Sequence, residues 1–180
     1  MPSKSKIKGS SFERETADFL TNLYGEKFIR VPGSGAYVGG KNAGRKEFLH
    51  EGTIRTFKGD IVPGESFPLF NAECKSYADF PFHQLFSGSV KILDEWINQC
   101  VTAADPDDFN IIFMKFNRKG KYIAVQAQPS NTTLILTRHF NYTSGIHGHW
   151  FIMAHDLFWE LNSDQVKILC GSKNQSTQTN

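Results

Sequence analysis

The sequence predicts an α/β domain in which a central β-sheet is flanked by helices. Two observations favour this fold class: apolar residues recur at helical spacing in two stretches, and short runs rich in Ile, Val and Phe, bounded by turn residues, lie between and after them. A chain of 180 residues can bury a sizeable core and is short for two domains. We expect one domain over residues 10–170, after a flexible basic arm at 1–9 and before a disordered polar tail at 171–180.

The first third of the chain predicts one helix, one strand and a long polar passage. An N-cap signal at Ser10 and apolar residues at helical spacing up to Gly25 predict a helix over residues 11–24. A strand is expected over 27–31, because a proline and a glycine-rich turn follow it. The passage 36–58 is rich in glycine and basic residues, and we interpret it as a substrate-contacting loop.

The remaining chain predicts strands and helices in alternation, with turn residues between them. A strand after Gly59-Asp60 and a strand over 69–75 are joined by a turn at Pro63-Gly64. A connector at 76–81 leads to an amphipathic helix over 82–104 with a break at 87–89. The elements that follow are strands over 110–116 and 122–126 joined by a hairpin turn at 117–120, an edge strand over 132–137, a strand over 150–153, and a short helix from Asp156 to Leu161.

Composition excludes several classes of protein. Hydrophobic residues make up 39% of the chain and charged residues 21%, as in soluble globular proteins. No apolar run is long enough to span a membrane, and the N-terminus lacks the apolar core of a signal peptide. Cys74, Cys100 and Cys170 are odd in number and widely spaced, which favours reduced thiols. We therefore expect a cytoplasmic protein without a membrane partner.

Charge is distributed unevenly along the chain. The net charge is only +2, but residues 1–60 hold eleven Lys and Arg against seven Asp and Glu, whereas residues 61–180 hold nine against eleven. A basic surface beside an acidic site would suit a phosphodiester substrate, because neutralised phosphates supply most non-specific affinity for nucleic acids. A solvated, lysine-rich terminus is the simpler interpretation of the charge alone.

One strand carries the chemically informative side chains. If residues 69–75 form a strand, Asn71, Glu73 and Lys75 share one face, since side chains alternate. The turn before this strand would bring Asp60 close to Glu73. Two carboxylates and an ammonium at one sheet edge suggest a site for a hard cation with a charged helper.

This arrangement resembles the PD-(D/E)XK nuclease superfamily. Gly59-Asp60 matches the first acidic position, with Gly in place of the usual Pro, and Glu73-Cys74-Lys75 matches the E-x-K tripeptide. Glu13 matches the acid on the first helix. The resemblance implies a restriction-endonuclease-like fold with a central mixed β-sheet flanked by helices.

A closer resemblance is to archaeal Holliday junction resolvases and their phage relatives. Residues 8–14 (KGSSFER) are similar to the K-G-x-x-x-E-R start of those proteins, and residues 30–35 (RVPGSG) to their R-x-x-x-S-G segment. Residues 96–99 (WINQ), with the strand that follows, are similar to the W-x-x-Q helix of phage resolvase-like proteins. The resemblance covers residues 8–126, and the passage 36–58 is longer than in the archaeal enzymes.

The resemblance implies a Mg²⁺-dependent DNA endonuclease, with Mn²⁺ able to substitute. Asp60, Glu73 and the backbone carbonyl of Cys74 would hold the metal, and Glu13 would bind it directly, through water or at a second metal. Lys75 would orient or activate the attacking water and stabilise developing negative charge. These residue types suit that chemistry, because Mg²⁺ prefers oxygen ligands and lowers the pKa of its water.

The expected partner is DNA, in particular four-way junctions in a prokaryotic cell or a phage-infected host. Symmetric cutting of a junction requires two equivalent sites, which implies a homodimer. Gln99 falls one helical turn after Trp96 and is a further candidate for the site, although ordinary solvation on a helix surface explains it equally well. Ser34 is also expected in the catalytic site, where it would hydrogen-bond a phosphate oxygen. The residues expected to contact DNA are Lys8, Arg14, Arg30, Ser34, Lys41, Arg45 and Lys46.

Several alternatives stay open at this stage. The same fold could cut flaps, nicks or plain duplex, or the chain could be a catalytically silent DNA-binding module. Taken singly, Glu13 is an ordinary first-turn carboxylate, and Glu73 with Lys75 is a same-face ion pair. The aromatic residues after 139 suggest core or a dimer surface. A structural zinc site would draw on His139, His147, His149 and His155, without the usual ligand spacing.

Overall fold

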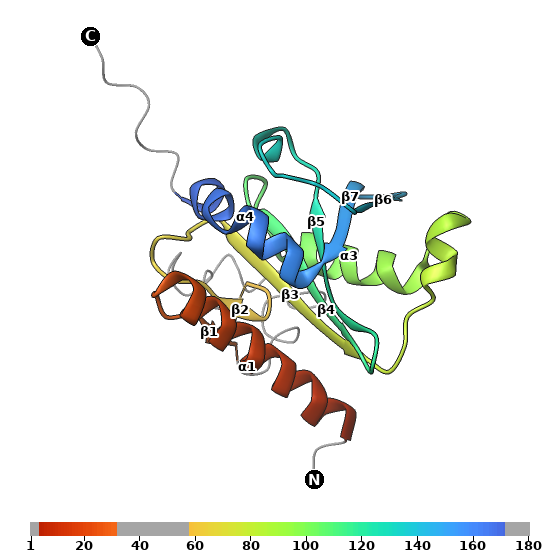
Figure 1. Cartoon of the computed structure of the whole chain (residues 1–180), viewed down its shortest axis with the longest axis horizontal. Helices are drawn as coiled ribbons and strands as arrows, with labels where there is room; N and C mark the ends of the chain where they lie inside the picture. The colour runs from red at the N-terminus through yellow and green to blue at the C-terminus, as the bar shows by residue number, and fades with distance from the viewer. Residues whose placement is uncertain (1–3, 32–57, 172–180) are drawn as a thin grey trace.

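The protein is an α/β fold built on a five-stranded mixed sheet (Figure 1). The computed structural model describes residues 4–31 and 58–171. The strand order is β3-β4-β5-β7-β6; β3 and β4 are parallel, and the other neighbours are antiparallel. In chain order these strands are β3 (Phe70–Tyr77), β4 (Phe109–Phe116), β5 (Gly120–Gln126), β6 (Phe140–Ser144) and β7 (Gly148–Ala154).

Helices cover both faces of the sheet. Helices α1 (Lys4–Tyr24) and α4 (His155–Cys170) pack on one face, and α3 (Lys91–Ala103) packs on the other (Figure 1). Two short 3₁₀ helices, η2 (Phe82–Phe86) and η3 (Pro129–Asn131), lie in the connections. The sheet thus separates two hydrophobic cores, one beneath α1 and α4 and one beneath α3. This is the restriction-endonuclease-like architecture that the resemblance implied.

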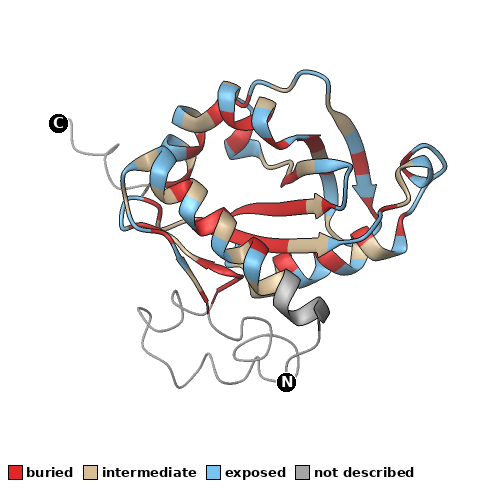
Figure 2. Cartoon of the chain, turned by 60° about the horizontal axis from the view of Figure 1, so that its bottom comes forward, coloured by how far each residue is buried: buried red, intermediate tan, exposed pale blue. Residues whose placement is uncertain are grey.

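The alternation predicted for β3 is confirmed. Phe70, Ala72 and Cys74 join the core beneath α1 and α4. Glu73 meets Gln99 of α3 on the opposite face. Figure 2 shows that the strands at the centre of the sheet are almost wholly buried, so these polar side chains stand at an interior surface.

A short ribbon brings the first acidic residue to the sheet. Strands β1 (Ile29–Arg30) and β2 (Ile61–Val62) pair antiparallel, apart from the main sheet. Asp60 then bonds on both sides: its N–H donates to the carbonyl of Ala72 at 2.8 Å, and its own carbonyl accepts the N–H of Val31 at 2.9 Å. Asp60 therefore lies on the outer edge of β3, the edge strand.

Three predicted elements differ from the structure. The expected arm is helical from Lys4 onward, because lysines are good helix formers and nothing in this segment stops the helix. The edge strand expected over 132–137 is wrong. The N–H and the C=O of Ile135 are both hydrogen-bonded to the Asn162 side chain, so they are not available to a neighbouring strand. The expected helix from Asp156 to Leu161 is too short: α4 runs through to Cys170, and Val166 and Cys170 continue its buried face.

The expected break in the middle helix is confirmed, since η2 ends at Phe86 and α3 begins at Lys91. No helix within the described ranges is both long and apolar enough to cross a membrane.

Candidate active site

Asp60 is fixed against β3 by a glycine and two hydrogen bonds. Gly59 has a φ of +57°, and a Cβ there would lie 2.3 Å from the carbonyl oxygen of Ala72, so only glycine lets the backbone rest on the strand. The Asp60 carboxylate then accepts the N–H of Cys74 through Oδ2 at 2.8 Å. The position that resembles the first acid of the nuclease motif is thus fixed by its own backbone and by β3.

Glu73 lies in a closed set of three polar side chains. Its Oε1 accepts a hydrogen bond from Lys75 Nζ at 2.6 Å and another from Gln99 Nε2 at 2.6 Å. Lys75 Nζ also donates to Gln99 Oε1 at 2.7 Å. Glu73 is 3% exposed, so these contacts hold a carboxylate that is almost out of water. The predicted neighbourhood of Glu73 and Lys75 is confirmed, and Gln99 belongs to it.

The electrostatics of the pair favour an added cation. The pKa of Glu73 is raised to about 8, chiefly by burial and next by the neighbouring Asp60 carboxylate, while Lys75 opposes both effects. Ionising both carboxylates beside one ammonium would leave a net negative charge in a poorly solvated place, and the raised pKa of Glu73 reflects that cost. A divalent cation between them would offset this repulsion.

A backbone oxygen adds a third candidate ligand for a cation. In an extended strand, the N–H and C=O of one residue point to the same side. Since the Cys74 N–H is directed at Asp60, the Cys74 carbonyl is directed to that outer edge too. Within residues 4–31 and 58–171, no three His, Cys, Asp or Glu side chains cluster as a metal site. Two carboxylates and a carbonyl nevertheless fit Mg²⁺, which is commonly held by one or two carboxylates plus water and phosphate.

Glu13 lies on the neighbouring helix and has a cationic partner. It forms an ion pair with the guanidinium of Arg30. Arg30 pairs in turn with Ile61 of β2, the residue that follows Asp60. The Cys74 thiol, whose pKa is raised chiefly by burial and next by Asp60, also responds to the charge of Glu13. Glu13 therefore stands within electrostatic reach of the strand that carries Glu73. Its role in binding metal stays a prediction.

The residues expected to contact DNA are only partly described. Arg14 is exposed on α1, and its Nε donates to the carbonyl of Ser10 at 3.3 Å. Arg30 is paired with Glu13. The side chain of Lys8 lies outside the described part of the chain, as do Ser34, Lys41, Arg45 and Lys46 entirely.

One buried cluster near the site was not foreseen from the sequence. Lys58 is 5% exposed, and its ammonium pairs with Asp108 and, at 2.5 Å, with Asp105. The sequence offered one signal, a lysine two residues before Asp60. Asp105 and Asp108 follow the end of the helix expected over 82–104, and nothing in the sequence connects them with Lys58.

The histidines of the C-terminal third have separate partners. His147 Nε2 lies 2.9 Å from Asn98 Oδ1, and His149 Nδ1 lies 2.9 Å from Thr143 Oγ1. His155 contacts the carboxylate of Asp156, and burial lowers its pKa. The neighbouring aromatic side chains Tyr142, Trp150, Phe158 and Trp159 are buried in the two cores.

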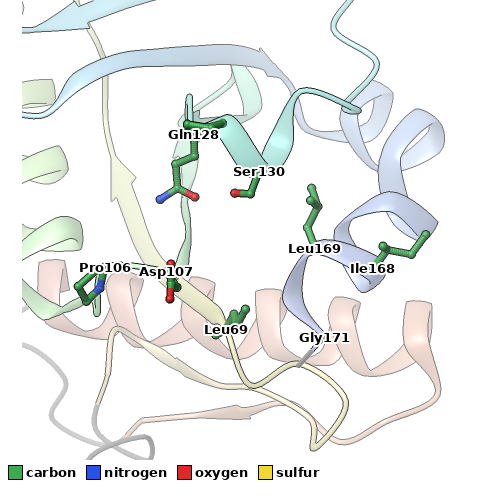
Figure 3. A pocket seen from close by; sticks show the side chains of 9 residues that line it. Leu69, Pro106, Asp107, Gln128, Ser130, Ile168, Leu169 and Gly171 are labelled. Atoms are coloured by element: carbon green, nitrogen blue, oxygen red, sulfur yellow. The ribbon is translucent and has the colours of Figure 1, made fainter. Parts of the chain in front are cut away.

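A separate pocket of about 450 Å³ lies at the end of α4. Ile168 and Leu169 approach it from α4, Pro106 and Asp107 from the loop before β4 (Figure 3). Neither Asp60 nor any of the residues bonded to Glu73 lines it, so this hollow and the carboxylate site are different places.

Comparison with protein families matches residues 4–156 to the family described as "phage putative PDDEXK endonuclease". The chain belongs to this family. Neither the comparison with curated proteins nor that with solved structures found a match. The matched range contains Glu13, Asp60, Glu73, Lys75 and Gln99, whereas nearly all of α4 lies beyond it. Membership of this PD-(D/E)XK endonuclease family supports nuclease activity, and enzymes of this superfamily generally use divalent metals.

Proposed function

We propose that this protein is a Mg²⁺-dependent DNA endonuclease that acts at four-way junctions. The observation that carries the metal site is the meeting of Asp60 and Glu73 on the edge of β3, with the Cys74 N–H bonded to Asp60. The resemblance of residues 8–14 and 30–35 to junction-resolving enzymes supports the choice of substrate.

Asp60, Glu73 and the Cys74 carbonyl would hold the cation. When bound, Mg²⁺ supplies a Lewis acid for the scissile phosphate and lowers the pKa of its water. Engagement of Glu73 would relieve the repulsion that raises its pKa. Glu13 would contribute through water or at a second metal, from its place beside Arg30.

Lys75 would position the attacking water and stabilise charge on the phosphate. An ammonium has three N–H donors, and two of those of Lys75 go to Glu73 and Gln99. The third donor is directed by these two contacts and suits a water or a phosphate oxygen. Hydrolysis then forms one P–O bond to water as the P–O bond to the leaving oxygen breaks, without a covalent intermediate on the protein.

DNA binding would draw on Arg14 and on the basic residues Lys8, Lys41, Arg45 and Lys46, with Ser34 donating to a phosphate oxygen. Symmetric cutting of a junction requires two equivalent sites, so we include a homodimer in the proposal. Sedimentation of the purified protein, alone and with junction DNA, tests that part.

The test is cleavage of matched substrates. The full chain is incubated with a four-way junction, a flap, a nicked duplex and a plain duplex of shared sequence, with and without Mg²⁺. We expect metal-dependent cutting with a preference for the junction. Equal cutting of junction and duplex would remove the junction assignment and keep the nuclease. Binding without cutting in either Mg²⁺ or Mn²⁺ would identify a DNA-binding module.

A further inference from the structure

The buried ion pair of Lys58 stands beside the site and has no part in the chemistry proposed above. Lys58 and Asp108 are 5% and 2% exposed, whereas the second acid, Asp105, has a side chain that is 62% exposed. Burying an ammonium and a carboxylate costs desolvation energy that their attraction does not generally exceed, so apolar residues would stabilise a core at least as well. The pair needs a reason other than stability.

Asp108 anchors the cluster to the start of the sheet. Its Oδ2 also accepts the N–H of Asp105 at 2.7 Å, and its carbonyl accepts the Gln128 side chain at 3.0 Å. The next residue, Phe109, donates its N–H to Leu69 at 2.7 Å, where β3 and β4 begin to pair. The acid therefore belongs to a rigid point at the beginning of both strands.

Lys58 connects this point to Asp60 through a single residue, Gly59. Contact between the Gly59 backbone and β3 leaves no room for a Cβ, and the bonds of Asp60 to Ala72 and Cys74 follow directly. A shift of Lys58 along the strand edge would carry Asp60 with it. A Cβ at position 59 would also lie 3.0 Å from Asn71 Oδ1, so a side chain atom as well as the β3 backbone confines Gly59. Within the described ranges, this buried oxygen has no hydrogen-bond partner.

We propose that Lys58 is a positioning residue for Asp60. Its ion pair with Asp108 sets where Gly59 and Asp60 rest on β3, and so sets the spacing of the Asp60 and Glu73 oxygens that a divalent cation would require. The inference rests on the proposed metal site. It assigns Lys58 no contact with metal, water or DNA.

The test is the affinity of the metal-free protein for Mn²⁺ alone, measured by calorimetry without DNA. The main variant is Lys58→Met/Asp108→Asn, which removes both buried charges and keeps an acceptor for the Asp105 N–H. We expect it to stay folded, with weaker protection of the Asp60 and Cys74 amides from hydrogen exchange. Mn²⁺ affinity should fall roughly 10- to 100-fold, as for residues that orient metal ligands. Saturating Mn²⁺ should restore most of the maximal cleavage rate.

Lys119→Met is the matched control, because it breaks the exposed pair with Asp79 and should leave Mn²⁺ affinity unchanged. Lys58→Arg keeps the charge and should keep most of the affinity. Wild-type affinity in a folded double variant would overturn the role of Lys58 and leave the proposed function standing. If the wild type itself binds no Mn²⁺, the metal site fails and this inference with it. If the double variant does not fold, Asp108→Glu decides: it keeps both charges but moves the carboxylate that holds Lys58 by one methylene, so Mn²⁺ affinity should fall, and wild-type affinity would overturn the proposal.

Discussion

Two clusters of charge lie along β3, each with one ammonium and two carboxylates, and they differ in how far the second carboxylate is exposed to water. At the start of the strand, the ammonium of Lys58 meets one fully buried carboxylate, Asp108, and a second, exposed one, Asp105. Further along, one ammonium, Lys75, faces two carboxylates, and Glu73 has a raised pKa. In the first cluster the second carboxylate, Asp105, is solvated, so the one buried carboxylate is matched by one ammonium. In the second cluster both carboxylates are buried, and ionising the two of them would leave excess negative charge away from water. This difference separates a fixing contact from a site that would accept a cation.

Loss of one site carboxylate should give the largest effect. Asp60→Asn removes a metal ligand and one negative charge while keeping an acceptor for the Cys74 N–H. We expect DNA cleavage in Mg²⁺ to fall roughly 10³-fold or more, because the cation supplies several kcal/mol of transition-state stabilisation. DNA binding should persist. The control is Glu160→Gln, an exposed acid on α4, and cleavage by Asp60→Asn at the control's rate would refute the assignment.

Loss of Lys58 alone should be the most costly change for folding. Lys58→Met leaves Asp108 as an uncompensated buried charge, and we expect about 3–5 kcal/mol of lost unfolding free energy in urea titrations. Lys119→Met, at an exposed pair, should leave the unfolding midpoint unchanged. Equal midpoints for the two variants would show that the two kinds of pair do not differ as described.

Removal of the Gln99 amide should have a smaller effect on activity. Gln99→Met breaks two hydrogen bonds and leaves the Lys75–Glu73 contact in place. We expect roughly a tenfold loss of cleavage, in the range found for residues that orient ligands. Gln84→Met, at an exposed glutamine of η2, provides the comparison. Identical rates would return Gln99 to the role of an ordinary helix-surface residue.

The pH dependence of stability tests Glu73 without any measurement of cleavage. The pKa of Glu73 is raised from its usual value near 4.5 to about 8, so the folded metal-free state holds a proton that the unfolded state has lost. Glu73 therefore destabilises the fold as pH rises between these values, by at most about 1.4 kcal/mol per pH unit. Urea titrations from pH 5 to 8 should show this fall in the wild type. The slope should flatten in Glu73→Gln, and parallel slopes would contradict the assignment.

Local patterns in the sequence predicted most of the sheet and the centre of the site. Alternation along β3 placed Glu73 and Lys75 on one face, and the turn before it brought Asp60 alongside. Hydrogen bonds between a side chain and the backbone of a residue far away in the sequence could not be predicted. The Asn162 side chain of α4 hydrogen-bonds the backbone of Ile135, and this long-range contact replaces the strand expected there.

Lys58, beside the site, makes a second contact that could not be predicted from the sequence. It lies in a polar stretch and looks like a solvated lysine, because its partner Asp108 is fifty residues away and is brought near only by the pairing of β3 with β4. Spacing within a strand or helix is visible in the sequence. A contact between two loops depends on the whole fold.

The most direct test is the location of the cation. Crystals of the protein grown or soaked with Mn²⁺ and measured at the manganese absorption edge would show its position by anomalous scattering. We predict a peak between the carboxylates of Asp60 and Glu73, within coordination distance of the Cys74 carbonyl, that is absent from Asp60→Asn crystals. A peak elsewhere, or none at saturating Mn²⁺, would contradict the account.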